Sequence, residues 1–127
     1  MLCFYPEGIY TLSLHDALPI LIRTFDQKEV EDLAKYGSIP VINGLTDFCH
    51  PCQVLADLMT IREKFGGFSG LKLCYIGDGN NMANSLIVGG LKMGMKVSAA
   101  TPAAYRPDPS VLEFAAGYEG QFLLTEE

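Results

Sequence analysis

The sequence predicts an α/β fold, a parallel sheet with flanking helices. Two observations lead to this fold class. Short apolar runs alternate along the chain with longer runs in which apolar residues recur at helical spacing, and strands that alternate with helices pair in parallel. The composition is globular, because 49% of the 127 residues are hydrophobic and 19% are charged. This length suffices for one modest domain and is short for two.

Charge, hydropathy and cysteine content argue against several classes of protein. The net charge of −6 makes nucleic acid and anionic membranes poor partners for the surface as a whole. No apolar run approaches the ~20 residues of a membrane span, and the first residues lack the basic start of a signal peptide. Four cysteines do not form a dense disulfide framework, so we expect reduced thiols and a cytoplasmic protein.

The first half of the chain contains two strand–helix pairs after an irregular start. Residues 1–21 show no sustained hydrophobic period and stay unassigned. Asp26 is a suitable helix cap, and Glu29 stands three residues later as its capping-box partner. The predicted elements are a strand over 21–25, a helix from Asp26 to Gly37, a strand over 39–43 and a helix over 50–65.

The second half continues the same alternation. Residues 71–76 give the strongest strand signal in the chain, and the glycine-rich turn 77–81 closes that strand. In a parallel α/β fold, ligands bind at the carboxyl ends of the strands, so the loops that follow strands are the candidate sites. The remaining predicted elements are helices over 82–93 and 109–116 and strands over 96–100 and 121–124.

A candidate anion site lies in the stretch 47–53, Asp-Phe-Cys-His-Pro-Cys-Gln, at the start of a predicted helix. Pro51 stands where the first helical turn tolerates a residue without an N–H. His50 and Gln53 are three residues apart and can face one small ligand. Free backbone N–H groups and the helix dipole favour an anion there. The pattern therefore indicates an anion site with one imidazole and one amide.

The turn 77–81, Gly-Asp-Gly-Asn-Asn, has three interpretations. It is similar to the start of a dinucleotide fingerprint, but Met82 stands where that pattern has its third glycine, and no acidic residue follows the strand 96–100. The glycines can instead serve only the reversal from strand to helix. In the third interpretation, Asn80 or Asn81 hydrogen-bonds a small polar substrate.

Plain structural roles compete with function at the other polar residues of these loops. A zinc site needs two more ligands than the Cys49-x-x-Cys52 pair, and only the helix start and the His-Pro pair support a redox role. We therefore expect no metal and no cofactor, and packing is the alternative for both cysteines. A lone His50 is more often structural than catalytic, and Arg23 is by default a solvated charge.

Six short motifs stand in order along the chain: Arg-Thr-Phe at 23–25, Ser-Ile-Pro-Val-Ile-Asn-Gly-Leu-Thr-Asp at 38–47, His-Pro-Cys-Gln at 50–53, Leu-Ala-Asp-Leu at 55–58, Gly-Asp-Gly-Asn-Asn at 77–81 and Gly-Met-Lys-Val at 94–97. Together they resemble the aspartate/ornithine carbamoyltransferase family, over about 22–127. Aspartate-using relatives share His-Pro-x-Gln but lack the Gly-Asp-Gly-Asn-Asn turn, so the ornithine-using branch is favoured. A relative that uses putrescine or another amine stays open.

The resemblance implies a reaction and a set of residue roles. The side-chain amine of L-ornithine attacks carbamoyl phosphate and gives citrulline and phosphate, in arginine biosynthesis or catabolism. Negative charge develops on the carbamoyl oxygen and needs preorganised donors. In the family pattern, Arg23 and His50 hydrogen-bond that oxygen, and Arg23 also reaches the phosphate. Gln53 holds the carbamoyl NH2 through its amide oxygen, and Asn81 holds the amino-acid end of ornithine.

The resemblance also implies a division of the chain. Residues 22–49 correspond to the end of a carbamoyl-phosphate-binding domain, 50–66 to a connecting helix and 67–127 to the first half of a Rossmann-like ornithine-binding domain. The family's Ser-x-Arg-Thr-Arg, Ser-Met-Gly and His-Cys-Leu-Pro segments are absent from this sequence. We therefore expect an internal fragment that is inactive alone, from an enzyme that is a homotrimer when complete.

The segment 1–21 stands apart from this resemblance. Its residues 13–20, Ser-Leu-His-Asp-Ala-Leu-Pro-Ile, resemble a translated sequencing adapter. We interpret the segment as the product of a misassembled reading frame, in which His15 has no role.

Two other classes of function compete with carbamoyl transfer. The first is a non-catalytic α/β module that binds a small anion at the helix start of His50, which calorimetry with carbamoyl phosphate or phosphate would distinguish from an inert fragment. The second is part of a Rossmann-type oxidoreductase built on the turn 77–81, which a fluorescence titration with NADH would detect.

Overall fold

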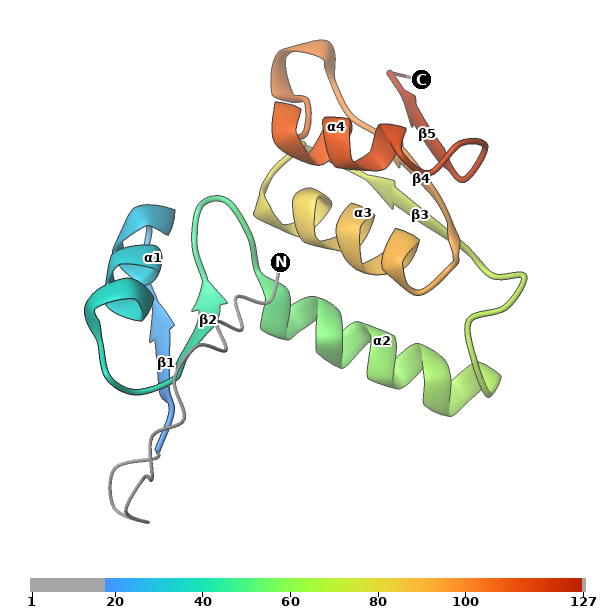
Figure 1. The fold of residues 1–127 in the computed structure, drawn as a ribbon. Coiled ribbons are helices and arrows are strands. Elements are labelled where there is room, and N and C mark those ends of the chain that lie inside the picture. The colour runs from blue at the N-terminus through green and yellow to red at the C-terminus, as the bar shows by residue number, and fades with distance from the viewer. Residues whose placement is uncertain (1–17, 127) are drawn as a thin grey trace.

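Two small parallel sheets and their helices make up residues 18–126, the part of the chain that this computed structural model describes (Figure 1). The predicted α/β fold with parallel strands and flanking helices is confirmed, because every strand pairing in this part of the chain is parallel. The first sheet pairs β1 (Ile20–Arg23) with β2 (Val41–Leu45), and the second has the order β3 (Lys72–Ile76), β4 (Lys96–Ala100), β5 (Phe122–Thr125).

The helices alternate with the strands along the chain. The longest, α2, has 15 residues and leads from the first sheet to the second. The sequence did not predict the short 3-10 turn η1 (Ala103–Tyr105) between β4 and the last helix. No helix within residues 18–126 combines the length and the apolar character that a membrane crossing requires. The α-helices are α1 (Gln27–Tyr36), α2 (Pro51–Phe65), α3 (Asn81–Lys92) and α4 (Pro109–Ala116).

Polar side chains cap the helix starts. Asp26 accepts the Lys28 N–H at the start of α1, and Asp108 accepts the Ser110 N–H at the start of α4. Asp26 is the cap of α1 as predicted, but the prediction that Glu29 is its capping-box partner is wrong. The Glu29 carboxylate accepts a hydrogen bond from the Thr24 hydroxyl, which follows β1. Glu29 therefore ties α1 to the strand before it.

The first two strands differ in their bounds from the predicted ones. β2 was expected over 39–43 and begins two residues later, because Pro40 has no N–H to give to the sheet and offers only its carbonyl, which accepts from Ile20. β1 begins at Ile20, so it includes the last two residues of the segment 1–21. The first 17 residues of that segment, His15 among them, lie outside the described residues.

One face of the second sheet carries the main core. α3 and α4 pack on it, and the buried side chains Ile87, Leu91, Val97, Ala99, Val111 and Ala115 form one cluster. A second cluster, Val54, Leu58 and Met95, joins α2 to α3. On the opposite face, Ile76 is 80% exposed and Leu123 is 59% exposed. The described part of the chain therefore covers only one side of this sheet.

A glycine pair brings α3 close to its neighbours. A Cβ on Gly89 would lie 2.5 Å from Val54 Cγ1 of α2, and one on Gly90 would lie 2.7 Å from Val97 Cγ2 of β4. Glycine in a helix interior costs about 1 kcal/mol relative to alanine. The sequence retains two here because side chains would push α3 away from both α2 and the sheet.

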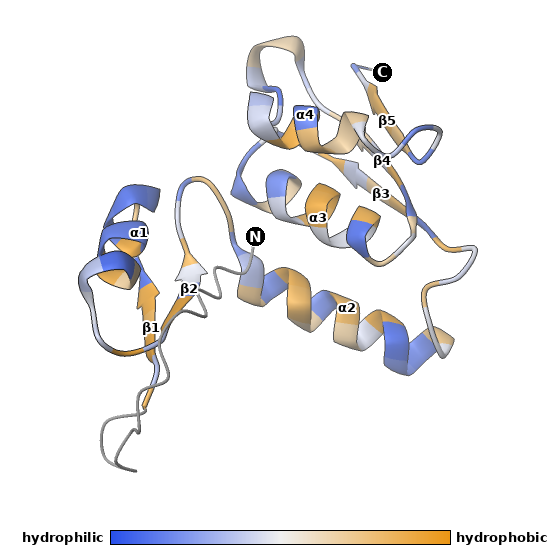
Figure 2. Cartoon of the chain, viewed as in Figure 1, coloured by the Kyte–Doolittle hydropathy of each residue, from blue (hydrophilic) through white to orange (hydrophobic). Residues whose placement is uncertain are grey.

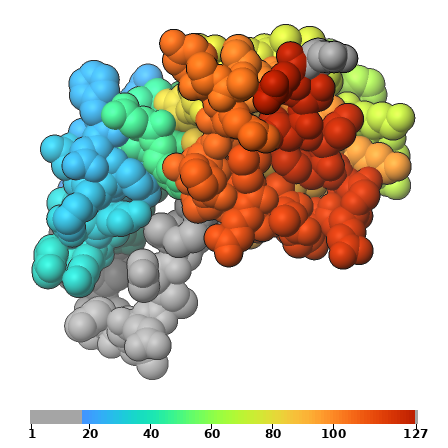
Figure 3. Space-filling view, turned by 90° about the horizontal axis from the view of Figure 1, so that it is seen from above, coloured from blue at the N-terminus to red at the C-terminus, as the bar shows by residue number. Residues whose placement is uncertain are grey.

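The first sheet and α1 form a small lobe beside the larger one (Figure 3). Most of α1 is hydrophilic, whereas α2 shows bands of both characters (Figure 2). Val30 is the buried apolar residue of α1, while Leu21 and Phe25 stay exposed. The small lobe thus buries little apolar surface within the described residues.

Candidate functional site

The candidate site is centred on the loop 46–50, which joins β2 to α2. Arg23, at the carboxyl end of β1, pairs with Leu45 after a register shift that follows Ile22, so its side chain starts at the same sheet edge as this loop. A Cβ on Gly44 would lie 2.9 Å from Arg23 Cγ. The apolar stem of Arg23 therefore passes over Gly44, and glycine at this position lets it do so. The Arg23 residue is exposed.

His50 is the N-cap of α2, and Pro51 is the first helical residue as predicted. The ring is half-buried, and its Nδ1 accepts the Gln53 backbone N–H over a long 3.4 Å. A neutral imidazole whose Nδ1 accepts carries its proton on Nε2. His50 can therefore act as cap and, through Nε2–H, as a donor to a ligand.

The Gln53 carboxamide extends along α2 rather than back toward its start. Its Nε2 donates to Asp57 Oδ1 at 3.0 Å, one helical turn further on. No hydrogen bond from residues 18–126 reaches its Oε1. The arrangement leaves an amide acceptor at the exposed surface of the first turn.

Of the two asparagines in the turn 77–81, Asn80 caps α3 and Asn81 reaches the loop 46–50. Asn80 Oδ1 accepts the N–H groups of Met82 and Ala83. Asn81 Nδ2 donates to the Thr46 carbonyl at 2.8 Å. Capping therefore occupies Asn80, and a ligand role at this turn falls to Asn81.

Three side chains of α3 hold the loop 46–50 by its backbone. Besides the bond from Asn81, Asn84 Nδ2 donates to the Phe48 carbonyl at 2.9 Å, and Ser85 Oγ accepts the His50 N–H at 2.8 Å. Asn84 and Ser85 are 5% and 8% exposed. The sequence motifs did not indicate either residue. The signal that could have found them is their spacing from Asn81 along one side of an otherwise apolar helix.

The four predicted site residues are therefore near one loop, but no hydrogen bond joins the side chain of one to the side chain of another. His50 and Gln53 meet through the cap bond, and Asn81 is tied to the residue that begins the loop. Arg23 lies at the adjoining strand end. Their convergence on a single ligand stays a prediction.

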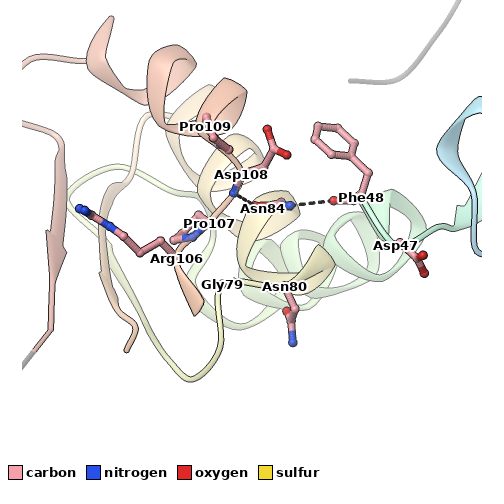
Figure 4. Close-up of a pocket in the computed structure, with 9 residues that line it drawn as sticks. All are labelled: Asp47, Phe48, Gly79, Asn80, Asn84, Arg106, Pro107, Asp108 and Pro109. Carbon is pink, nitrogen blue, oxygen red and sulfur yellow. Dashed lines mark hydrogen bonds between the residues drawn. The ribbon is translucent and has the colours of Figure 1, made fainter. Parts of the chain in front are cut away.

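The second glycine of the turn 77–81 serves a close backbone approach. A Cβ on Gly79 would overlap the backbone of Arg106 and Pro107, and the Gly79 N–H donates to the Tyr105 carbonyl at 2.6 Å. Beside this contact lies an open pocket of about 440 Å³, in which Asn84 bridges Phe48 and Asp108 (Figure 4). The charged ends of Asp47 and Arg106 point away from Asn84 in this view.

Both thiols of the C-x-x-C pair contact the β2 residue Asn43. Cys49 Sγ accepts from Asn43 Nδ2 at 3.2 Å, and Cys52 Sγ donates to the Asn43 carbonyl at 3.3 Å. These contacts fasten the start of α2 to the sheet. Among residues 18–126, no three His, Cys, Asp or Glu side chains gather closely enough to hold a metal ion.

The fold and this loop together define a class: a parallel α/β protein in which the amino ends of two helices, α2 and α3, meet at the loop 46–50. The chain belongs to the aspartate/ornithine carbamoyltransferase family. The family's carbamoyl-P binding domain matches residues 11–63, and its Asp/Orn binding domain matches residues 69–126. The first match begins within the segment 1–21, which the resemblance had left out.

Curated relatives agree with this assignment. The chain is 60% identical over 96 residues to the ornithine carbamoyltransferase of Thermococcus kodakarensis and 56% identical over 102 residues to that of Gloeobacter violaceus. These matches cover 76% and 80% of this chain but 30% and 33% of the two relatives. The chain thus spans about a third of the length of the curated relatives it matches.

Solved structures give the same result. The ornithine carbamoyltransferase of Pyrococcus furiosus superposes with a TM-score of 0.79 at 53% identity, covering 84% of this chain and 36% of that one. The Gloeobacter violaceus enzyme superposes with a TM-score of 0.76 at 52% identity, covering 87% of this chain and 39% of that one.

Proposed function

We propose that this chain supplies part of an ornithine carbamoyltransferase site, at which the side-chain amine of L-ornithine attacks carbamoyl phosphate. The observation that supports this most is the tie between two helix starts. Asn81 donates to the Thr46 carbonyl, and Ser85 accepts the His50 N–H. These bonds hold Asn81, proposed for ornithine, close to His50, proposed for the carbamoyl group. An attacking amine and its target require such proximity.

The hydrogen-bonding atoms that remain after internal pairing complement a carbamoyl group. His50 Nε2–H and the Arg23 guanidinium are donors for the carbamoyl oxygen, on which negative charge develops during attack. Gln53 Oε1 is an acceptor for the carbamoyl NH2, because Nε2 is held by Asp57. Asn81 Oδ1 is an acceptor for the amino-acid end of ornithine, because Nδ2 is held by Thr46.

The reaction needs no covalent enzyme intermediate. The lone pair of the neutral amine forms the new C–N bond, and the bond between the carbamoyl carbon and the phosphate oxygen breaks with its electron pair leaving on the phosphate. The proton that the amine nitrogen loses goes to the departing phosphate. Cys52 therefore has no nucleophilic task, and its thiol donates to the Asn43 carbonyl.

We assign residues 22–49 to the end of the carbamoyl-phosphate-binding domain, 50–66 to a connecting helix and 67–127 to part of the ornithine-binding domain. Two separate sheets joined by α2 support this division. The complete protein in this proposal is a cytoplasmic homotrimer of arginine metabolism.

Citrulline formation tests the proposal. The purified 127-residue chain should produce no more citrulline from ornithine and carbamoyl phosphate than its His50→Ala variant. A chimera, in which residues 18–126 replace the matching segment of the Pyrococcus furiosus enzyme, should be active. The proposal would fail if the folded chimera were inactive with ornithine, and activity with putrescine instead would reassign the amine.

A further inference from the structure

The N-cap backbone of α2 is satisfied in an unusual way. In a capping box, the side chain of the third helical residue, when it is Glu or Gln, reaches back and accepts the N-cap N–H. The third residue of α2 is Gln53, and the N-cap is His50. The local sequence thus contains the capping-box glutamine, yet the Gln53 amide donates forward to Asp57 at 3.0 Å.

Ser85 occupies the place that the capping box would give to Gln53. Its Oγ accepts the His50 N–H at 2.8 Å from α3, 35 residues along the chain. The same hydroxyl donates to the Asn81 carbonyl at 2.8 Å, which directs its proton away from His50 and its lone pair toward it. Ser85 is 8% exposed, so little water competes for either bond.

We propose that Ser85 is a positioning residue that caps His50 in place of Gln53 and so leaves the Gln53 carboxamide free for the carbamoyl group. Without the hydroxyl, a half-buried N–H at His50 would lack an acceptor, and the capping-box residue able to serve it is Gln53. Gln53 would then turn back onto the helix start, and its Oε1 would be withdrawn from the ligand. Ser85 also links the backbones of His50 and Asn81, the proposed residues for the two substrates.

The inference rests on the proposed function for the role of Gln53, but its structural part can be measured without substrate. In the 127-residue chain, NMR would follow the Gln53 side-chain NH2 signals and the hydrogen exchange of the His50 amide. Amide signals of β4 serve as the reference for intact folding. The variants are Ser85→Ala, Ser85→Thr, which keeps the hydroxyl, and the matched control Ser110→Ala, which removes an exposed hydroxyl bonded to Asp108.

Ser85→Ala should move the Gln53 NH2 signals and leave the β4 amides unchanged, while Ser85→Thr and Ser110→Ala should leave Gln53 as it is. In a Gln53→Ala background, which removes the substitute acceptor, Ser85→Ala should speed His50 amide exchange about tenfold. Unmoved Gln53 signals in Ser85→Ala, or unchanged exchange in the double variant, would overturn the inference. Uniform loss of protection, β4 included, would also overturn it, because Ser85 would then act on stability alone.

A titration of the same samples with carbamoyl phosphate separates this inference from the proposed function. The unsubstituted chain should show shifts at Gln53, and Ser85→Ala should weaken the response about tenfold, with recovery in Ser85→Thr. If no sample responds to carbamoyl phosphate while the substrate-free result holds, the proposed function fails at this site. The capping of His50 by Ser85 in place of Gln53 then still stands. If Ser85→Ala responds like the unsubstituted chain, Ser85 does not position Gln53 for the ligand.

Discussion

At the scale of single residues, Arg23 is the charged member of the candidate site, and its side chain is exposed. Its stem rests on Gly44, and its head is exposed at the strand end next to the loop 46–50. A guanidinium can bind a carbamoyl oxygen and a phosphate oxygen together through its fork of donors. In the proposed function, Arg23 therefore acts through contact with the ligand rather than by supporting the structure.

Removing this head should weaken binding and slow the reaction together. In the chimera with the Pyrococcus furiosus enzyme, Arg23→Ala should raise the KM for carbamoyl phosphate and lower kcat, each about tenfold or more. Steady-state kinetics measure both. Arg62→Ala, which removes an exposed arginine in the last turn of α2, is the control. Kinetics of Arg23→Ala equal to those of the control would remove Arg23 from the site.

Local sequence signals were sufficient to predict the cap of α1 and the first helical residue of α2. Pro51 at the first position of α2 and the cap Asp26 of α1 follow from rules that span a few residues. Asn84 and Ser85 could not be predicted in the same way. Their partners lie about 35 residues away, and nothing in a single sequence states which loop a polar helix residue will face.

At the scale of elements, α3 joins the two parts of the site because it packs closely on both α2 and β4. The glycine pair Gly89–Gly90 permits that approach, while Asn81 and Ser85 at the other end of the helix hold the loop 46–50. A displacement of α3 would therefore change the position of His50. The packing of α3 therefore helps to set the geometry of the site.

The variant Gly89→Ala tests the close contact between α3 and α2. The added methyl would lie 2.5 Å from Val54 Cγ1, a buried and stiff side chain. Overpacking costs about 1–3 kcal/mol and outweighs the ~1 kcal/mol gain in helix propensity. Thermal and urea unfolding should show a net loss of about 1 kcal/mol, the middle of the difference between these two terms, and at most about 2 kcal/mol. Gly67→Ala, where no atom lies within 4 Å of the new Cβ, should be neutral. A Gly89→Ala variant as stable as Gly67→Ala would refute close contact between α2 and α3.

At the scale of the whole molecule, the second sheet has one face that residues 18–126 cover and one face that they leave open. Parallel sheets are normally covered on both sides. Cys74, Ile76 and Leu123 share the uncovered face, because Cys74 and Leu123 lie in register through Ser98 and Ile76 is two residues beyond Cys74. An apolar sheet face exposed to water favours self-association.

The open face should make the 127-residue chain associate with itself. Sedimentation velocity should show species larger than a monomer, and the double variant Ile76→Thr, Leu123→Thr should shift the distribution toward monomer while keeping β propensity. Met59→Gln removes an exposed apolar side chain from α2 and should not shift it. A purely monomeric unsubstituted chain at tens of micromolar would contradict the prediction.

The most direct test of the central claim is the turnover number of the chimera after His50→Ala. The claim is that the imidazole at the start of α2 stabilises the charge that develops on the carbamoyl oxygen. Loss of one such donor lowers kcat by about 10²–10³-fold in other enzymes. We expect a fall in that range with the fold intact by circular dichroism. A kcat within about twofold of the unsubstituted chimera would contradict the account.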